Sequence, residues 1–180
     1  DVLIDIFWPD DAEKGKRSLY WVSSILRGCL RLKDGVDSIL RHQAMLSLNP
    51  DLPRWHDLEQ LEALTARAAQ QTGVEQAESL RRAVQLYRGH FMEGCYMDWV
   101  EPVRERAFRC VCEALLTLAV WAQGVGRAAE SLEHANRLWE LDPCRQDACI
   151  LAMQALQALG RAEEAVRLYE RCRKALLKEL

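Results

Sequence analysis

Residues 126–177 read GRAAESLEHANRLWELDPCRQDACILAMQALQALGRAEEAVRLYERCRKALL. Gly126-Arg127-Ala128 recurs 34 residues later as Gly160-Arg161-Ala162. This spacing is the period of a tetratricopeptide helix pair. Glycine permits a tight turn between two helices, and Pro143 stops the helix that ends at Leu141-Asp142. The stretch therefore predicts two stacked helix pairs.

The helix boundaries follow from the same turn signals. The predicted pairs are 107–124 with 128–141, and 145–159 with 162–178. Upstream, leucines and alanines at helical spacing predict a third, diverged pair that is broken at Gly73 and ends at Gly89. Between that pair and the clear repeat lies GHFMEGCYMDWVEP, residues 89–102, which we expect to pack as an insert or short helix, with its aromatic residues filling the core rather than forming a binding site. Since each pair buries its apolar face only against its neighbours, residues 57–180 are predicted to form one superhelical unit.

Residues 1–50 follow a different pattern. The short apolar segment VLIDIFW is stopped by Pro9, Asp10 and Asp11 are good N-caps, and a helix from about Ala12 to Leu32 follows. Alternating apolar residues around His42 to Ala44 predict a two-stranded hairpin. The stretch PDLPRWH, residues 50–56, contains two prolines and predicts a linker at residues 51–56. The expected fold is mainly α, with a helix, a turn, a second helix and a β-hairpin ahead of a tetratricopeptide-like α-α superhelix.

Composition limits the classes of protein that fit. The chain is 49% hydrophobic and 28% charged, as in soluble globular proteins, and holds neither a membrane-length apolar run nor a secretory signal. Its seven cysteines are odd in number and fall mostly within helical apolar patterns, which favours a reducing cytoplasm. We therefore expect structural thiols and no metal site. A phosphate loop, a nucleophile elbow and an HExxH motif are all missing from the sequence. We therefore expect neither catalysis nor a cofactor.

The charge is concentrated in one segment. The net charge of the chain is −3, yet residues 14–47 contain seven basic side chains and two acidic ones. Within KRSLYWVSSILRGCL, residues 16–30, one side of a helix collects Leu19, Val22, Leu26, Cys29 and Leu30, which is the pattern of a helix packed on a small core. Basic, aromatic and small residues gather on the other side. Such a polar face can enter a DNA major groove, with the hairpin as a wing beside the phosphates. The candidate DNA-contacting residues are Lys14, Lys16, Arg17, Tyr20, Trp21, Ser24, Arg31, Arg41 and His42. The same pattern also fits an ordinary solvated face or a packing surface.

A second class of function is a helical-repeat scaffold that binds a protein or peptide in its concave groove. The candidate partner-binding residues are Trp121, Gln123, Arg145, Gln146 and Gln154, at or near the first helices of the pairs. These side chains could equally be ordinary exposed residues.

The order of elements resembles the bacterial transcriptional activator domain family, which includes the antibiotic regulatory proteins of actinomycetes. The residues that carry the resemblance in the first part are Leu3, Phe7-Trp8-Pro9, Leu19, Leu26-Arg27, Leu30, Leu46 and Leu48. In the helical part they are Asp57, Leu61, Tyr87-Arg88-Gly89, Phe91, Trp99, Arg104, Leu141-Asp142-Pro143, Met153, Gly160-Arg161, Ala165, Tyr169 and Arg173. The match covers nearly the whole chain and depends on order and spacing rather than on any single motif.

The resemblance implies a winged helix followed directly by a tetratricopeptide-like domain. Residues 1–50 correspond to the second helix, the recognition helix and the wing hairpin of a winged helix, without its first helix and N-terminal sheet. The resemblance implies binding of double-stranded DNA by this part. For residues 57–180 it implies activation, oligomerisation or effector sensing, with the transcription machinery or a second copy as partner and no membrane. The alternative remains a tetratricopeptide-type scaffold with a winged-helix remnant that does not bind DNA.

Overall fold

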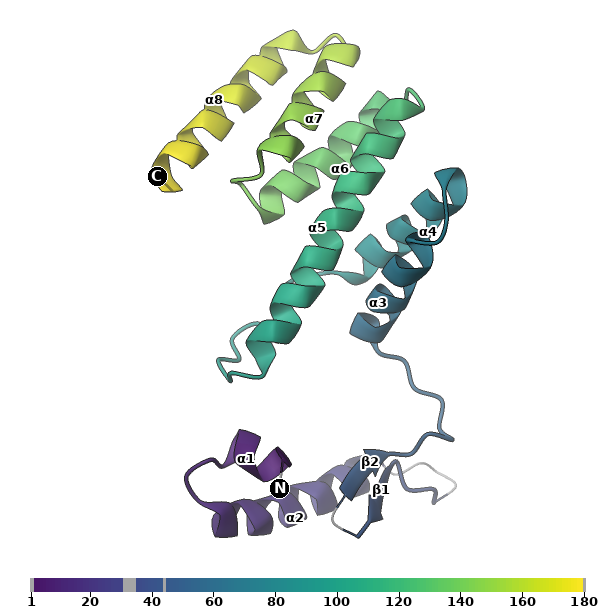
Figure 1. Cartoon of the computed structure of the whole chain (residues 1–180), viewed down its shortest axis with the longest axis vertical. Coiled ribbons are helices and arrows are strands. Elements are labelled where there is room, and N and C mark those ends of the chain that lie inside the picture. The colour runs from purple at the N-terminus through teal and green to yellow at the C-terminus, as the bar shows by residue number, and fades with distance from the viewer. Residues whose placement is uncertain (1, 31–34, 44, 180) are drawn as a thin grey trace. The chain divides into compact units, whose positions relative to one another are not determined.

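The computed structural model describes residues 2–30, 35–43 and 45–179. The chain divides into two compact units, Asp1–Arg54 and Trp55–Leu180. The described residues form eight helices and one antiparallel hairpin (Figure 1), which confirms the predicted mainly helical fold with a hairpin ahead of stacked helices.

The first unit contains two helices and the hairpin. Its elements are α1 (Val2–Phe7), α2 (Ala12–Cys29), β1 (Ile39–His42) and β2 (Met45–Leu48). Asp11 caps α2 by accepting a hydrogen bond from the Lys14 amide at 2.9 Å. The described helix ends at Cys29 rather than at Leu32, and residues 31–34 lie outside the described part of the chain.

Close packing of α1 on α2 depends on Gly15. A Cβ at this position would lie 2.6 Å from Cγ2 of Ile4, closer than side chains tolerate. Both Gly15 and Ile4 are buried. In the hairpin Ile39 pairs with Leu48 and His42 with Met45, and Gln43 turns the chain with a φ of +53°.

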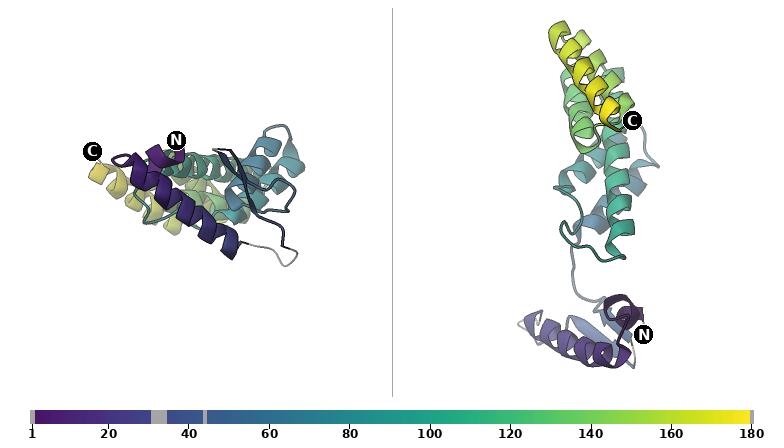
Figure 2. Two further views of the ribbon diagram at one scale, coloured as in Figure 1. Left: turned by 90° about the horizontal axis from the view of Figure 1, so that it is seen from below. Right: turned by 90° about the vertical axis from the view of Figure 1, so that its left-hand side faces the viewer.

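The second unit is a stack of three helix pairs (Figures 1 and 2). The pairs are α3 (Asp57–Ala68) with α4 (Gly73–Leu86), α5 (Val100–Gly124) with α6 (Ala128–Leu141), and α7 (Gln146–Ala158) with α8 (Ala162–Glu179). Gly126 and Gly160 have φ of +77° and +73° at the two repeated turns. This left-handed conformation explains why glycine recurs at that position.

Two apolar clusters hold the stack together. The first joins α3, α4 and α5 to α6 and includes the fully buried Leu115, Leu118 and Leu138. The second joins the end of α5 to α6, α7 and α8, largely through small residues such as Ala135 and Ala152. Small side chains let the helix backbones approach closely, so each pair is packed on the next.

Residues 87–99 connect α4 to α5 without a helix. Arg104 in α5 holds this connection by donating hydrogen bonds to the carbonyl oxygens of Phe91, Met92 and Cys95, at 3.1, 3.0 and 2.9 Å. The expectation that its aromatic residues fill the core holds only in part, since Phe91 is half-buried and Tyr96 is 93% exposed.

Candidate nucleic-acid interface

One face of α2 is exposed along its length. Lys14, Arg17, Trp21 and Ser24 follow each other at steps of three or four residues, so they share a side of the helix. Tyr20 lies beside them, and all five side chains are exposed. Trp21 and Tyr20 remain 65% and 66% exposed. Within its unit this face therefore combines positive charge with open aromatic surface.

The hairpin adds a further cation to this face. The Arg41 guanidinium of β1 lies 5.7 Å from the centroid of the Tyr20 ring, within range of a cation–π contact. Its Nε donates to the Gln43 carbonyl oxygen at 3.4 Å, and the neighbouring His42 is exposed. The structure thus brings Arg41 and Tyr20 together from distant parts of the first unit.

Two predicted DNA-contacting residues stand apart from this group. Lys16 lies one turn before Tyr20, at the edge of the shared face, and its ammonium is engaged in an ion pair with Glu13 at 2.8 Å. This hydrogen bond lowers the pKa of Glu13 and raises that of Lys16. The other residue, Arg31, lies outside the described part of the chain.

The opposite side of α2 is only partly covered. Ser23 is buried there and Leu19 and Val22 are half-buried, but Leu26 and Leu30 remain 43% and 47% exposed. Together with α1 and the hairpin this side lines an apolar cavity of about 490 Å³. The prediction that Leu26, Cys29 and Leu30 pack on a small core is therefore wrong for this unit, in which all three are exposed.

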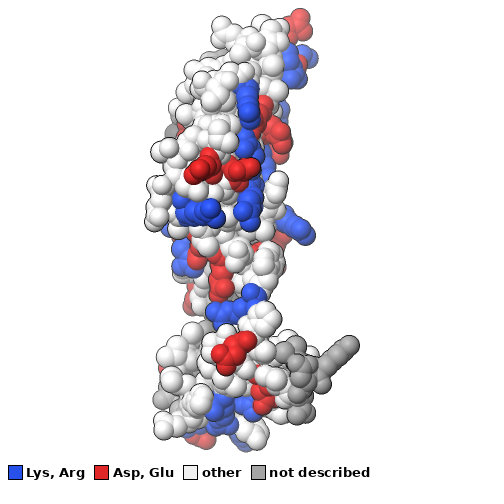
Figure 3. Space-filling view, turned by 90° about the vertical axis from the view of Figure 1, so that its right-hand side faces the viewer, with Lys and Arg blue, Asp and Glu red and all other residues white. Residues whose placement is uncertain are grey.

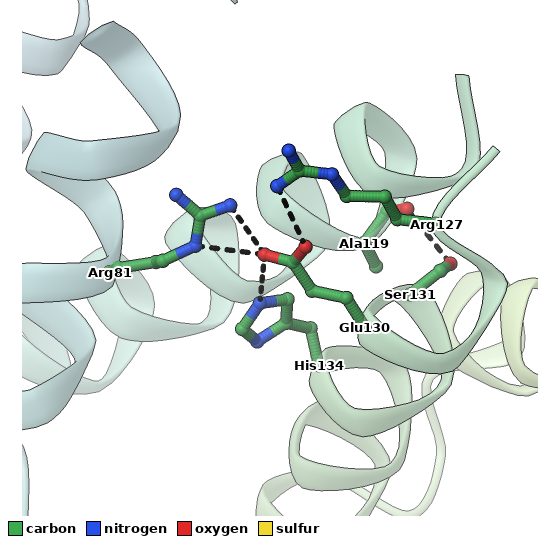
Figure 4. A network of polar contacts seen from close by, with 6 residues as sticks. All are labelled: Arg81, Ala119, Arg127, Glu130, Ser131 and His134. Atoms are coloured by element: carbon green, nitrogen blue, oxygen red, sulfur yellow. Dashed lines mark hydrogen bonds and ion pairs between the residues drawn. The ribbon is translucent and has the colours of Figure 1, made fainter. Parts of the chain in front are cut away.

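In the helical unit, the half-buried carboxylate of Glu130 joins α4 to α6 (Figure 4). Glu130 accepts hydrogen bonds from Arg81 Nε at 2.8 Å and Nη2 at 2.5 Å, and pairs with Arg127 at 3.4 Å. Burial is the largest single influence and opposes ionisation of Glu130, but the hydrogen bonds and charges of Arg81, Arg127 and His134 together lower its pKa. Nε2 of His134 lies 3.7 Å from the same carboxylate, and burial lowers the pKa of this imidazole.

The candidate partner-binding residues are largely engaged within the unit. Trp121 lies within cation–π range of two guanidinium groups, those of Arg81 at 4.9 Å and Arg127 at 5.2 Å from its ring centroid. Gln123 donates to Gln154 at 2.9 Å, which links α5 to α7.

Arg145, just before α7, forms an ion pair with Asp147 at 2.8 Å, and of the candidates only Gln146 and Gln154 are classed as exposed. These contacts indicate that several of the polar residues expected to bind a partner also stabilise the stack.

Sequence reasoning missed Arg81, Glu130 and His134. The signal for Glu130 and His134 is their spacing of four residues, which places both on one side of a helix. The pairing of Arg81 with Glu130 has no local signal, because 49 residues separate them in the chain.

The described residues place limits on other classes of site. No group of three or more histidine, cysteine, aspartate or glutamate side chains among them could hold a metal ion. Within the same residues, no helix is both long and apolar enough to cross a membrane.

The fold thus defines a class: a small helix-and-hairpin unit with an exposed basic and aromatic helix, followed by a stack of helix pairs. The family model described as bacterial transcriptional activator domain matches residues 56–180, and the chain belongs to this family. This is a regulatory family rather than an enzyme family, and membership implies a function of the transcriptional-activator type. No curated protein matches the sequence significantly.

Proposed function

We propose that this chain is part of a cytoplasmic transcription activator that binds double-stranded DNA through its first unit. The family of residues 56–180 supports the activator role. The observation that carries DNA binding is the exposed face of α2, where Lys14, Arg17, Tyr20, Trp21 and Ser24 all lie open. On this proposal the first unit is the C-terminal part of a winged helix, with α2 as recognition helix.

Each side chain of this face has a suitable chemical partner on DNA. Arg17 and Lys14 can donate to guanine edges or phosphate oxygens, and Ser24 to either. Tyr20 and Trp21 offer apolar surface to thymine methyl groups or sugars. Arg41 and His42 are placed on the hairpin to contact the adjacent phosphates as a wing.

The apolar side of α2 supports the same assignment. Exposed Leu26 and Leu30 and the cavity beneath α1 and the hairpin leave room for further apolar packing. In the proposed winged helix, the first helix and the N-terminal strands of the parent protein cover this side, so the basic face alone remains open.

The second unit has a different role in the proposal. Its charges are mixed, and acidic and basic side chains alternate over the face shown in Figure 3. A surface of mixed charge is a poor match for the uniformly negative DNA backbone. The helix pairs of this unit would instead contact the transcription machinery or a second copy of the chain.

The test is a mobility-shift titration of the full-length protein against its own upstream DNA. We expect binding to DNA that weakens as salt is added. The release of cations from the DNA phosphates contributes much of the binding free energy, and added salt reduces this contribution. Arg17→Ala and Trp21→Ala should each weaken binding by about tenfold, equivalent to about 1.4 kcal/mol.

Matched controls separate this face from general surface effects. Arg82→Ala and Trp55→Ala change exposed residues in the helical unit and should leave the affinity unaltered. Circular dichroism of every variant should match that of the parent. Absence of binding at low salt would contradict the proposal and favour the scaffold, whereas equal binding by all four variants would show that another face contacts DNA.

A further inference from the structure

Helix α8 carries a row of side chains on the side that faces away from the core of its unit. The row is Val166, Glu170, Arg173 and Leu177, at steps of four, three and four residues, which keeps its members on one side of the helix. Val166 and Leu177 are 63% and 68% exposed. On the opposite side Leu168 and Cys172 are buried in the second apolar cluster.

The middle of the row is a pair of opposite charges. Glu170 and Arg173 are joined by an ion pair of 2.9 Å, and their side chains are 45% and 55% exposed. Tyr169 lies beside them and is 52% exposed. Figures 1 and 2 show α8 as the last helix of the stack, with α7 on one side.

The order of residues along the row is self-complementary. It reads apolar, acidic, basic, apolar, so reversal of direction exchanges the two charges and leaves the apolar ends in place. A second α8 lying antiparallel would set Val166 against Leu177 of the second copy, and Glu170 against Arg173 of the second copy. A parallel arrangement would instead set Glu170 against Glu170 and Arg173 against Arg173.

The ends of the helix add less to this match. Glu163 and Glu164 lie in the first turn of α8, and the last turn contains Lys178 followed by Glu179. An antiparallel partner brings Lys178 of one copy near the acidic first turn of the other. A two-fold axis requires one patch to match itself, and this row meets that requirement in both its charges and its apolar groups.

We propose that α8 is a self-association surface, on which two copies of this chain pack antiparallel about a two-fold axis. The proposal names the surface for the self-association suggested above and does not depend on DNA binding by the first unit. Two helices meeting along so short a row bury less than the roughly 1,200–2,000 Å² of a stable interface. The dimer is therefore weak, with a dissociation constant on the order of 10–100 μM.

Sedimentation equilibrium of the full chain, without DNA, tests the proposal over concentrations of about 5–300 μM. The average mass should rise from that of a monomer towards that of a dimer. Val166→Glu should remain monomeric throughout. Val74→Glu alters a valine of α4 that is 64% exposed, and should associate like the parent protein.

A charge exchange tests the antiparallel register. Arg173→Glu sets a carboxylate against Glu170 of the second copy and should weaken association by at least about tenfold. The double variant Glu170→Arg with Arg173→Glu restores opposite charges, both across the axis and within the helix. The dissociation constant of this double variant should lie within about threefold of that of the parent.

Three results would overturn the proposal: a parent protein that stays monomeric over the whole range, equal loss of association in Val166→Glu and Val74→Glu, or no recovery in the double variant. Circular dichroism identifies any variant that has lost its helices. If Arg173→Glu is such a variant, Arg173→Lys, which keeps the positive charge and should associate like the parent, becomes the reference with which the double variant is compared. Since no DNA is present, failure here leaves the mobility-shift result unaffected, and failure of DNA binding leaves this one unaffected.

Discussion

Glu130 shows how one side chain can fix the spacing between two helix pairs. Its carboxylate accepts from Arg81 of α4 while its own backbone belongs to α6, so the contact joins the first pair to the second. The guanidinium groups of Arg81 and Arg127 also lie within cation–π range of the Trp121 ring. Because Glu130 is only 22% exposed, water screens these bonds less than it screens a surface pair.

Glu130→Gln should therefore destabilise the helical unit. The substitution keeps the size of the side chain but removes the charge that both guanidinium groups face, at an expected cost of about 1–2 kcal/mol in the free energy of unfolding. Urea denaturation followed by circular dichroism measures this change. Glu140→Gln alters an exposed carboxylate on the same helix and should change the stability by less than about 0.5 kcal/mol. Equal stability of the two variants would mean that the network contributes nothing.

At the scale of the element, the repeated turns depend on backbone conformation more than on space. A Cβ added at Gly160 or at Gly124 would meet no heavy atom within 4 Å, so neither site is crowded. The two differ in φ, which is +73° at Gly160, whereas Gly124 is the last residue of helix α5. Alanine substitutions at Gly160 and Gly124 therefore separate the energetic cost of a left-handed backbone conformation from that of an added methyl group.

Gly160→Ala should lower the free energy of unfolding by about 1 kcal/mol, because alanine is strained at positive φ. Gly124→Ala should be neutral or stabilising by up to about 1 kcal/mol, because alanine is the better helix former. Denaturant midpoints of the two variants and the parent, measured side by side, provide the comparison. A Gly160→Ala protein as stable as the Gly124→Ala protein would refute this account of the turn.

The elements that sequence predicts well are those with local signals. The 34-residue recurrence gave α6, α7 and α8 within about two residues of their observed ends, because glycine and proline act on the backbone directly. The start of α5 was predicted at residue 107 and is observed at Val100. Pro102 falls in the first turn, where a missing N–H costs no helical hydrogen bond, so it is compatible with a helix that begins at Val100.

The candidate sites likewise divide into features with a local sequence signal and features that depend on contacts between distant segments. The exposed face of α2 was predictable from helical spacing, because it involves one element. The approach of Arg41 to Tyr20, and of Arg81 to Glu130, was not, because each depends on how distant segments pack. Partner residues such as Gln123 and Gln154 were chosen by type and position, and the structure shows that they bond to each other.

At the scale of the whole molecule, the division at residues 54 and 55 separates two kinds of packing. Both apolar clusters of the helical unit are built from residues 58–176, and they hold its large, fully buried side chains. The first unit has a smaller buried set, chiefly Ile4 and Ile39, beside its apolar cavity. The helical unit therefore contains the apolar interior that an independent domain needs.

Residues 55–180, expressed alone, should fold as a helical domain with a single cooperative unfolding transition, because among the described residues both clusters of their core are built from their own side chains. Circular dichroism should show helix throughout the fragment, and its urea midpoint should match the main transition of the full chain. Residues 1–54 alone provide the reciprocal measurement: with Leu26, Leu30 and Leu48 exposed, this fragment should unfold at a lower urea concentration than the helical fragment. A disordered 55–180 fragment, or one that unfolds well below the full chain, would show that the first unit contributes to the stability of the helical stack.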